Sequence, residues 1–89
     1  MTTTDILRLV TDELAHAQAA HPGFHSGHEG YAVIKEELDE LWEAVRRDDS
    51  MQAGAEAVQV AAMAVRFLVD VCELDAVQDY IHGRQRARR

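Results

Sequence analysis

Two groups of acidic and amide side chains in neighbouring parts of the chain have the types and spacing of a metal site. In the first group, Glu37 and Glu40 are three residues apart. Side chains at this spacing are neighbours on one face of a helix, and here that face borders the apolar stripe. The second group is Glu56 with Gln59, and Glu56 lies in an otherwise apolar segment. The chemistry that these groups suggest is the binding of a hard cation by oxygen ligands.

Few cations are available in the sequence to neutralise these carboxylates. Lys35 and Arg66 are the only basic residues in the central parts of the two segments. Two carboxylates about 4 Å apart repel by about 4 kcal/mol at an effective dielectric constant of about 20, and an unpaired buried carboxylate is costly. A divalent metal removes this conflict, and oxygen ligands without thiolates favour Mg²⁺, with Mn²⁺ as the second choice. The alternative is that the first group is the solvated face of an amphipathic helix.

Helical periodicity runs through most of the chain, so the elements that must position these residues are helices. Thr3 or Thr4 is expected to cap the first helix. This helix ends by His21, because the residue before Pro22 is pushed out of helical geometry. Its expected apolar stripe consists of Ile6, Val10, Leu14 and Ala17.

A second helix carries the first acidic group. Ser26 and Glu29 match a capping box at its start, and the positive charges of Arg46-Arg47 suit its end. Glu37 and Glu40 are expected on the edge of its apolar face. That face is expected to consist of Ile34, Leu38, Leu41 and Val45.

A third helix follows the turn at residues 48–50 and carries the second group. Over residues 55–71 it is apolar in nearly every direction, which requires burial on all sides. Three other helices in a chain of 89 residues cannot enclose it, so part of its surface is expected to form a subunit interface. Asp75 is expected to cap a short fourth helix that stops at Gly83.

Length and charge limit the class of protein. A chain of 89 residues has room for one domain. We expect this domain to be all-α and to span residues 1–83. We also expect it to form oligomers, because a lone monomer of this size is only marginally stable. Residues 84–89 are expected to form a mobile basic tail. Residues 1–83 hold five basic and sixteen acidic side chains, a net charge of −11, which argues against a nucleic-acid partner.

No feature of the sequence directs the chain to a membrane or out of the cell. No apolar run reaches the ~18 residues of a membrane span, and the N-terminus lacks the pattern of a secretion signal. The single Cys72 has no internal disulfide partner. We therefore expect a cytoplasmic protein.

The order Glu36-Glu37-x-x-Glu40, then Glu56-x-x-Gln59, resembles the MazG-type all-α nucleoside triphosphate pyrophosphohydrolases, whose pattern is E-E-x-x-E then E-x-x-D. Residues 28–35 and 58–63 are also similar to small phage and bacterial members of that family. The resemblance implies a four-helix MazG-like bundle, a homodimer or homotetramer. It also implies Mg²⁺-dependent hydrolysis of a (deoxy)nucleoside triphosphate, for example the purine nucleotides dGTP or dATP, to the monophosphate and pyrophosphate.

The resemblance also implies the roles of the site residues. The metal ligands are Glu37, Glu40, Glu56 and, in the position of the family's aspartate, Gln59. An amide oxygen still coordinates a metal, but one negative charge is lost. The alternative function is therefore a catalytically degenerate helical module that binds a nucleotide or a protein partner.

Further residues are candidates for catalysis and for substrate contact. Glu36 or Glu40 orients or deprotonates the attacking water, and Glu40 is favoured as a ligand. Pairing with Asp70 is the favoured role of Arg66. The candidate phosphate contacts are His28, Lys35 and Arg66.

The resemblance also implies that the nucleobase lies between the first two helices, although Trp42 is favoured as a core or interface anchor. The expected base-binding surface consists of Ile6, Val10, Leu14, Phe24 and Trp42.

Histidines are concentrated around the first loop. His21, His25 and His28 suggest a zinc site, but the absence of cysteine partners favours a solvated loop. Glu13-x-x-His16 is the helical pair of di-iron bundles, which need two such pairs, and the chain has one.

Overall fold

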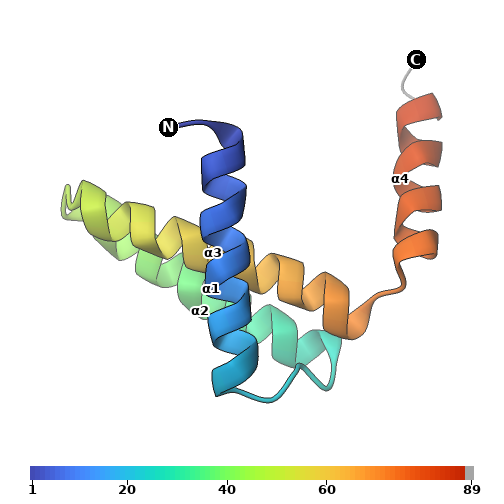
Figure 1. The fold of residues 1–89 in the computed structure, drawn as a ribbon, viewed down its shortest axis with the longest axis horizontal. Helices are drawn as coiled ribbons and strands as arrows, with labels where there is room; N and C mark the ends of the chain where they lie inside the picture. Colours follow the sequence, from blue (N-terminus) through green and yellow to red (C-terminus); the bar gives the residue numbers. More distant parts are fainter. Residues whose placement is uncertain (88–89) are drawn as a thin grey trace.

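The computed structural model describes residues 1–87 and shows four helices and, within that range, no strand (Figure 1). The helices are α1 (Thr3–Ala20), α2 (Gly27–Arg46), α3 (Ser50–Val71) and α4 (Leu74–Ala87). The all-α class expected from the sequence is confirmed. Within the described residues, no helix combines the length and the apolarity that crossing a bilayer requires.

Three of the helices pack together, and the fourth stands apart. α2 and α3 form a hairpin with an extensive shared face, and α1 crosses this hairpin, mainly in contact with α3 (Figure 1). α4 points away from these three helices beyond a linker formed by Cys72 and Glu73. One chain therefore contributes three helices to a common core.

The ends of α1 and α2 are set by capping side chains. The cap of α1 is Thr2 rather than the expected Thr3 or Thr4, because Asp5, three residues after Thr2, completes a capping box with it. α1 ends at Ala20, directly before His21, as expected. The expected cap at Ser26 is confirmed, since its side-chain oxygen accepts from the Glu29 N–H at 3.1 Å.

A tight turn joins α2 to α3, in the place that the sequence predicts. Asp48 adopts a left-handed conformation (φ 58°), which aspartate tolerates better than most residues. Asp49 then caps α3 by accepting from the Gln52 N–H at 3.0 Å. This turn holds the two acidic helices side by side.

α4 is longer than expected at both ends. It begins at Leu74, so Asp75 lies inside the first turn and is not the cap. It passes through Gly83 and ends at Ala87, because a single glycine costs a helix only about 1 kcal/mol and good helix formers follow. The first four residues of the expected tail are thus helical, whereas Arg88 and Arg89 lie outside the described residues.

The core lies between α1 and the hairpin. Val10, Ala62 and Met63 are buried at its centre. In the single chain α3 is not covered on all sides, since Leu68 and Val69 are 48% and 60% exposed. The side chains that pack around the centre include Leu14, Ala17, Phe24, Val33, Ile34 and Val58.

The packed face of α2 differs from the expected one. Leu38 and Val45, expected in the core, are about half exposed, at 50% and 48%. Glu37 instead lies in the middle of the packed stripe, because residues that recur every three or four positions share one face. The buried and half-buried residues of this stripe are Gly30, Val33, Ile34, Glu37, Leu41 and Ala44.

Arg66 ties the end of α1 to α3. Its side chain is 4% exposed, and its guanidinium donates to the carbonyl oxygens of Ala17 (3.2 Å), in the last turn of α1, and His21 (2.7 Å), directly after it. It also pairs with Asp70 at 3.3 Å, as the sequence favours. The same Asp70 oxygen accepts from the Phe24 N–H at 2.9 Å, so this cluster also fixes the loop between α1 and α2.

Gly30 allows α2 to approach α3 closely. A Cβ atom at this position would lie 2.6 Å from the Phe67 ring and 3.0 Å from the Phe24 ring, which is closer than real contacts allow. Gly54, in α3, has no such neighbour within 4 Å. The two glycines therefore serve as a matched pair for testing the packing.

We expect Gly30→Ala to destabilise the protein, because overpacking costs about 1–3 kcal/mol and exceeds the gain of about 1 kcal/mol in helix propensity. Gly54→Ala should instead stabilise it by up to about 1 kcal/mol. Urea denaturation of both variants measures the two changes. Equal shifts in the same direction would contradict the close packing at Gly30.

Candidate functional site

Three carboxylates from α2 and α3 converge where the two helices pack. Oxygen atoms of Glu37, Glu40 and Glu56 all lie within 4.8 Å of one another. Glu37 and Glu40 are one turn apart on α2, and Glu56 faces them from α3. The convergence expected from the sequence for these three residues is therefore present.

Glu56 has one buried oxygen without a partner. Its Oε1 accepts from the Gln52 side chain at 2.6 Å. Its Oε2 is shielded from solvent and forms no hydrogen bond. A buried acceptor left without a partner is costly, by about 1–3 kcal/mol and more when it is charged, so this atom indicates a position suited to a proton or a cation.

The electrostatics of the cluster favour protonation. The pKa of Glu37 is raised to about 7, first by burial, then by the hydrogen bond that its protonated carboxyl would donate to Glu56 and by the charges of Glu40 and Glu56. The pKa of Glu40 is also raised, by desolvation and then by the charge of Glu56. Both shifts have the direction that crowded like charges produce.

Three basic side chains of the two helices are paired elsewhere, whereas Arg47, directly after α2, lines a hollow together with Glu40 and Glu56. Lys35 binds Asp39 at 2.9 Å, and Arg46 binds Glu43 at 2.8 Å. Arg66 is held by the end of α1 and by Asp70. In the part of the chain that the structure describes, no ion pair neutralises the three carboxylates.

The donor set fits a hard divalent cation. All three ligands are carboxylate oxygens, which such cations prefer. The three oxygens lie within 4.8 Å of one another, and Glu40 is exposed, so its side chain has room to adjust towards an ion. The buried oxygen of Glu56 is the strongest indication that a bound group completes the cluster.

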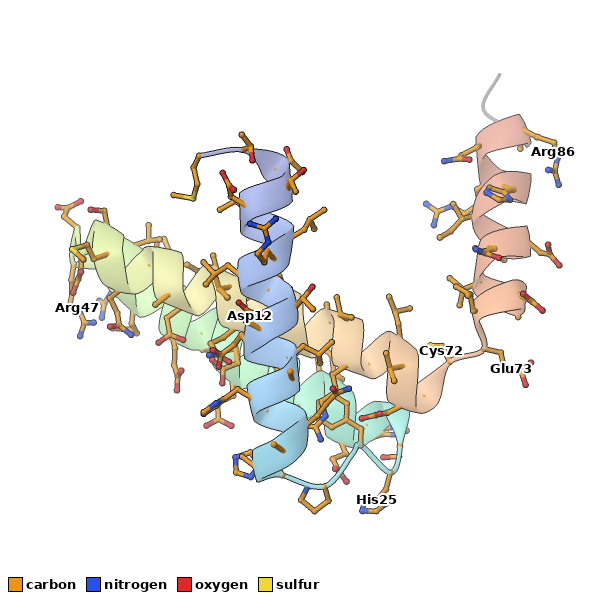
Figure 2. The ribbon with its side chains drawn as sticks, in the orientation of Figure 1. Asp12, His25, Arg47, Cys72, Glu73 and Arg86 are labelled. Atoms are coloured by element: carbon orange, nitrogen blue, oxygen red, sulfur yellow. The ribbon has the colours of Figure 1, made fainter. Side chains whose placement is uncertain are left out.

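Two hollows meet at the cluster. The larger, of about 690 Å³, lies between the C-terminal half of α1, the following loop, α2 and α3, and Glu37 reaches into its wall. The smaller, of about 500 Å³, contains Glu40 and Glu56. His25 lines the larger hollow and Arg47 lines the smaller one. Figure 2 shows these two residues towards opposite ends of the α2–α3 hairpin. Glu36 borders both hollows.

Some of the other predicted site residues lie beside the carboxylates or the hollows, and others do not. Glu36 is exposed and close to the cluster, as a residue acting on water would need to be. Gln59 lies in the wall of the larger hollow, where its amide donates to Glu13 on α1. Arg66 also borders this hollow. His28 and Lys35 line neither hollow, and Lys35 is paired on the surface, so the geometry does not support them as phosphate contacts.

The surface expected to bind a base between α1 and α2 is only partly brought together, and the larger hollow lies among α1, α2 and α3. Of the five residues expected there, Phe24 lines the larger hollow. Val10 is buried in the core, and Trp42 is 59% exposed on the surface rather than in the core. Any small molecule in the larger hollow would contact the loop after α1.

Several residues of the larger hollow are not predicted as site residues from the sequence. Their signals in the sequence are the density of histidines around Pro22 and the pair Glu13-x-x-His16, and three of these histidines line one hollow. The additional polar lining residues are Glu13, His16, His21, His25 and Glu29.

Comparisons with protein families, with curated proteins and with solved structures found no match for this chain.

The raised pKa of Glu37 predicts a pH-dependent stability in the absence of metal. Between pH 4.5, its ordinary pKa, and pH 7 the folded state keeps a proton that the unfolded state releases. The free energy of unfolding contributed by Glu37 should therefore fall as the pH rises through this window and level off above it. Melting temperatures measured in chelator at closely spaced pH values test this prediction.

Glu37→Gln is the control, since its side chain does not titrate. Its melting temperature should fall less steeply than that of the wild type over the same window. Parallel pH profiles for the two proteins would show that Glu37 titrates normally.

Proposed function

We propose that this protein is a MazG-like, Mg²⁺-dependent pyrophosphohydrolase that converts a (deoxy)nucleoside triphosphate to the monophosphate and pyrophosphate. One observation carries the proposal: Glu37, Glu40 and Glu56 converge around a buried, unpartnered oxygen. The neighbouring hollow of about 690 Å³ supports it, because its volume is in the range of small-molecule sites. The proposal also includes a cytoplasmic location, a homodimer or homotetramer and the purine deoxynucleotides that the resemblance implies.

In this proposal the three carboxylates hold Mg²⁺, with Mn²⁺ as a substitute. When bound, the metal neutralises the triphosphate and polarises the reacting phosphoryl group. Glu37, Glu40 and Glu56 fix its position from two helices whose relative placement is set by the α2–α3 packing.

Glu36 is the residue best placed to act on water. It is exposed and borders both hollows, so water can reach it beside the metal ligands. As a general base it would accept a proton while the water oxygen forms a bond to phosphorus and the phosphoric anhydride bond breaks. Pyrophosphate departs with the electrons of that bond, and the nucleoside monophosphate remains.

The larger hollow would hold the nucleoside. Phe24 offers an aromatic surface, while Glu13 and His16 offer polar groups for a base or sugar. Arg66 adds positive charge to the wall, although its donors are used by backbone carbonyls and Asp70. This hollow adjoins the carboxylates through Glu37, so the phosphates of a bound nucleotide would extend towards the metal ligands.

One observation favours the alternative function, a degenerate module that binds a nucleotide or a protein partner. Gln59 stands where the resemblance implies an aspartate, and its amide is bonded to Glu13. With one charge fewer, the site would hold fewer metal ions or hold one more weakly. Metal binding without turnover is the outcome that would support this alternative.

Mg²⁺ should raise the melting temperature of the wild type, because a ligand that binds only the folded state stabilises it by mass action. At about 100 times the dissociation constant the gain is about 2.7 kcal/mol, or about 10–20 °C for a domain of this size. Glu56→Gln should lose most of this increment while keeping its metal-free stability. Thermal denaturation with and without Mg²⁺ measures both.

Glu43→Gln is the matched control, since it removes one charge from the same hollow outside the cluster. It should keep the Mg²⁺ increment. A Glu56→Gln variant that is severely destabilised without metal, yet gains the full increment, would mean that Glu56 is a structural residue and not a ligand.

Incubation with individual nucleoside and deoxynucleoside triphosphates and Mg²⁺ should release pyrophosphate together with the monophosphate. Glu36→Gln should lower kcat by about 10²- to 10⁴-fold, the usual contribution of a general base, and Glu43→Gln should leave it unchanged. Product analysis by anion-exchange chromatography distinguishes pyrophosphate from orthophosphate. Absence of turnover across a panel that includes modified nucleotides, with Mg²⁺ binding intact, would replace the enzymatic proposal by the binding module.

A further inference from the structure

α4 carries an apolar face without a partner in the described chain. Leu74, Val77 and Ile81 recur at spacings of three and four, so they lie on one side of the helix. Leu74 is 70% exposed and Ile81 is 43% exposed. Figure 2 shows α4 separated from the other helices beyond the linker at Cys72 and Glu73. This stripe is called the α4 face below.

A second apolar surface runs along the side of α3 that α1 and α2 leave uncovered. Leu68 is 48% exposed and Val65 37% exposed, and small residues nearby would let another helix approach closely. This surface, called the α3 outer face, consists of Ala57, Ala64, Val65, Leu68 and Val71.

The exposed area of the chain is larger than that of a stable monomer. The accessible surface is 6813 Å² for a mass of 10.0 kDa, whereas a folded monomer of this mass typically exposes about 5,200 Å². The excess of roughly 1,600 Å² is about twice the 800 Å² that each partner buries in a standard interface. An interface of this size is similar to those of obligate dimers. It would bury the apolar surface that the small core of one chain leaves exposed.

The distribution of charge favours a second copy of the chain as the partner. Residues 1–73 hold five basic and fourteen acidic side chains, a net charge of −9, and residues 74–89 hold four basic and two acidic ones, a net charge of +2. α4 itself holds Asp75 and Asp79 in its first half and Arg84 and Arg86 in its second, so its basic second half would approach an acidic partner body. The two-residue hinge, Cys72 and Glu73, is extended at Cys72 and directs α4 away from the other helices of its own chain. Short hinges of this kind favour the exchange of a helix between two copies.

We propose that the α4 face docks on the α3 outer face of a second copy, which returns its own α4 in the same way. The dimer is reciprocal, so one pair of surfaces is used twice. This inference deepens the homodimer of the proposed function by naming its surfaces. It uses neither the carboxylates nor the hollows, so the test of the dimer and the nucleotide assay can fail independently.

Sedimentation equilibrium of the full chain tests this dimer. The wild type should have twice the mass of the 10.0 kDa chain. Ile81→Asp should weaken dimerisation by about 30-fold or more, as expected for a central interface residue. Ala76→Asp, on the opposite side of α4, should leave it unchanged. Circular dichroism checks that both variants remain helical. A monomeric wild type, or equal effects of the two variants, would overturn the proposal.

Disulfide trapping identifies the contact itself. In a Cys72→Ser background, one chain carries Ile81→Cys and another carries Leu68→Cys, and the two are mixed and oxidised. A disulfide between the two different chains is expected, and the pair of Ala76→Cys with Leu68→Cys should give far less. A third sample carries both Ile81→Cys and Leu68→Cys in one chain. Cross-linking within its monomers would show that α4 folds onto its own α3 and would overturn the exchange of α4 between copies. Cross-links formed only between two Leu68→Cys chains in the mixture would also overturn it.

Discussion

Like charges that share a helix interface repel each other, and in the described part of this chain the α2–α3 packing places three carboxylates together without a basic partner. The repulsion is reduced either by a proton, as the raised pKa of Glu37 indicates, or by a cation. Hydrophobic packing keeps the helices together in spite of it. Ala44 and Ala62 are fully buried, and their small side chains allow the helices to approach closely. The close approach that stabilises the hairpin is therefore also what crowds the carboxylates.

The position of Arg66 explains why the conflict is not relieved within the chain. It is the buried cation of α3 and lies on the same helix as Glu56. Its donors are engaged by the carbonyl oxygens of Ala17 and His21 at the end of α1 and by the Asp70 carboxylate. The same contacts hold the loop that closes the larger hollow. One arginine thus supports the wall of the hollow, and the acidic cluster beside it stays available for an external cation.

Local signals in the sequence were sufficient for most helix boundaries but not for the choice of helix face. Ser26 and Asp49 cap the expected helices because a cap depends on residues within one turn. Ile34 and Leu41 lie on the packed face of α2 as expected, but Leu38 and Val45 do not, because periodicity alone does not fix the rotation of an apolar face towards α3. The three carboxylates were predicted correctly because they depend on a single helix pairing. The lining of the larger hollow was not, since it requires knowing where α1 crosses the hairpin.

The contact between Gln59 and Glu13 gives a physical reason for the departure from the E-x-x-D pattern. Glu13 reaches the larger hollow from α1, and the Gln59 amide donates to its carboxylate. An aspartate at position 59 has no donor when ionised, and it would face Glu13 with a second negative charge beside Glu37. The amide instead binds Glu13 and links α1 to α3 along the wall of the hollow. An acidic group at this wall is thus supplied by Glu13 of α1, and the amide of Gln59 on α3 is the donor that pairs with it.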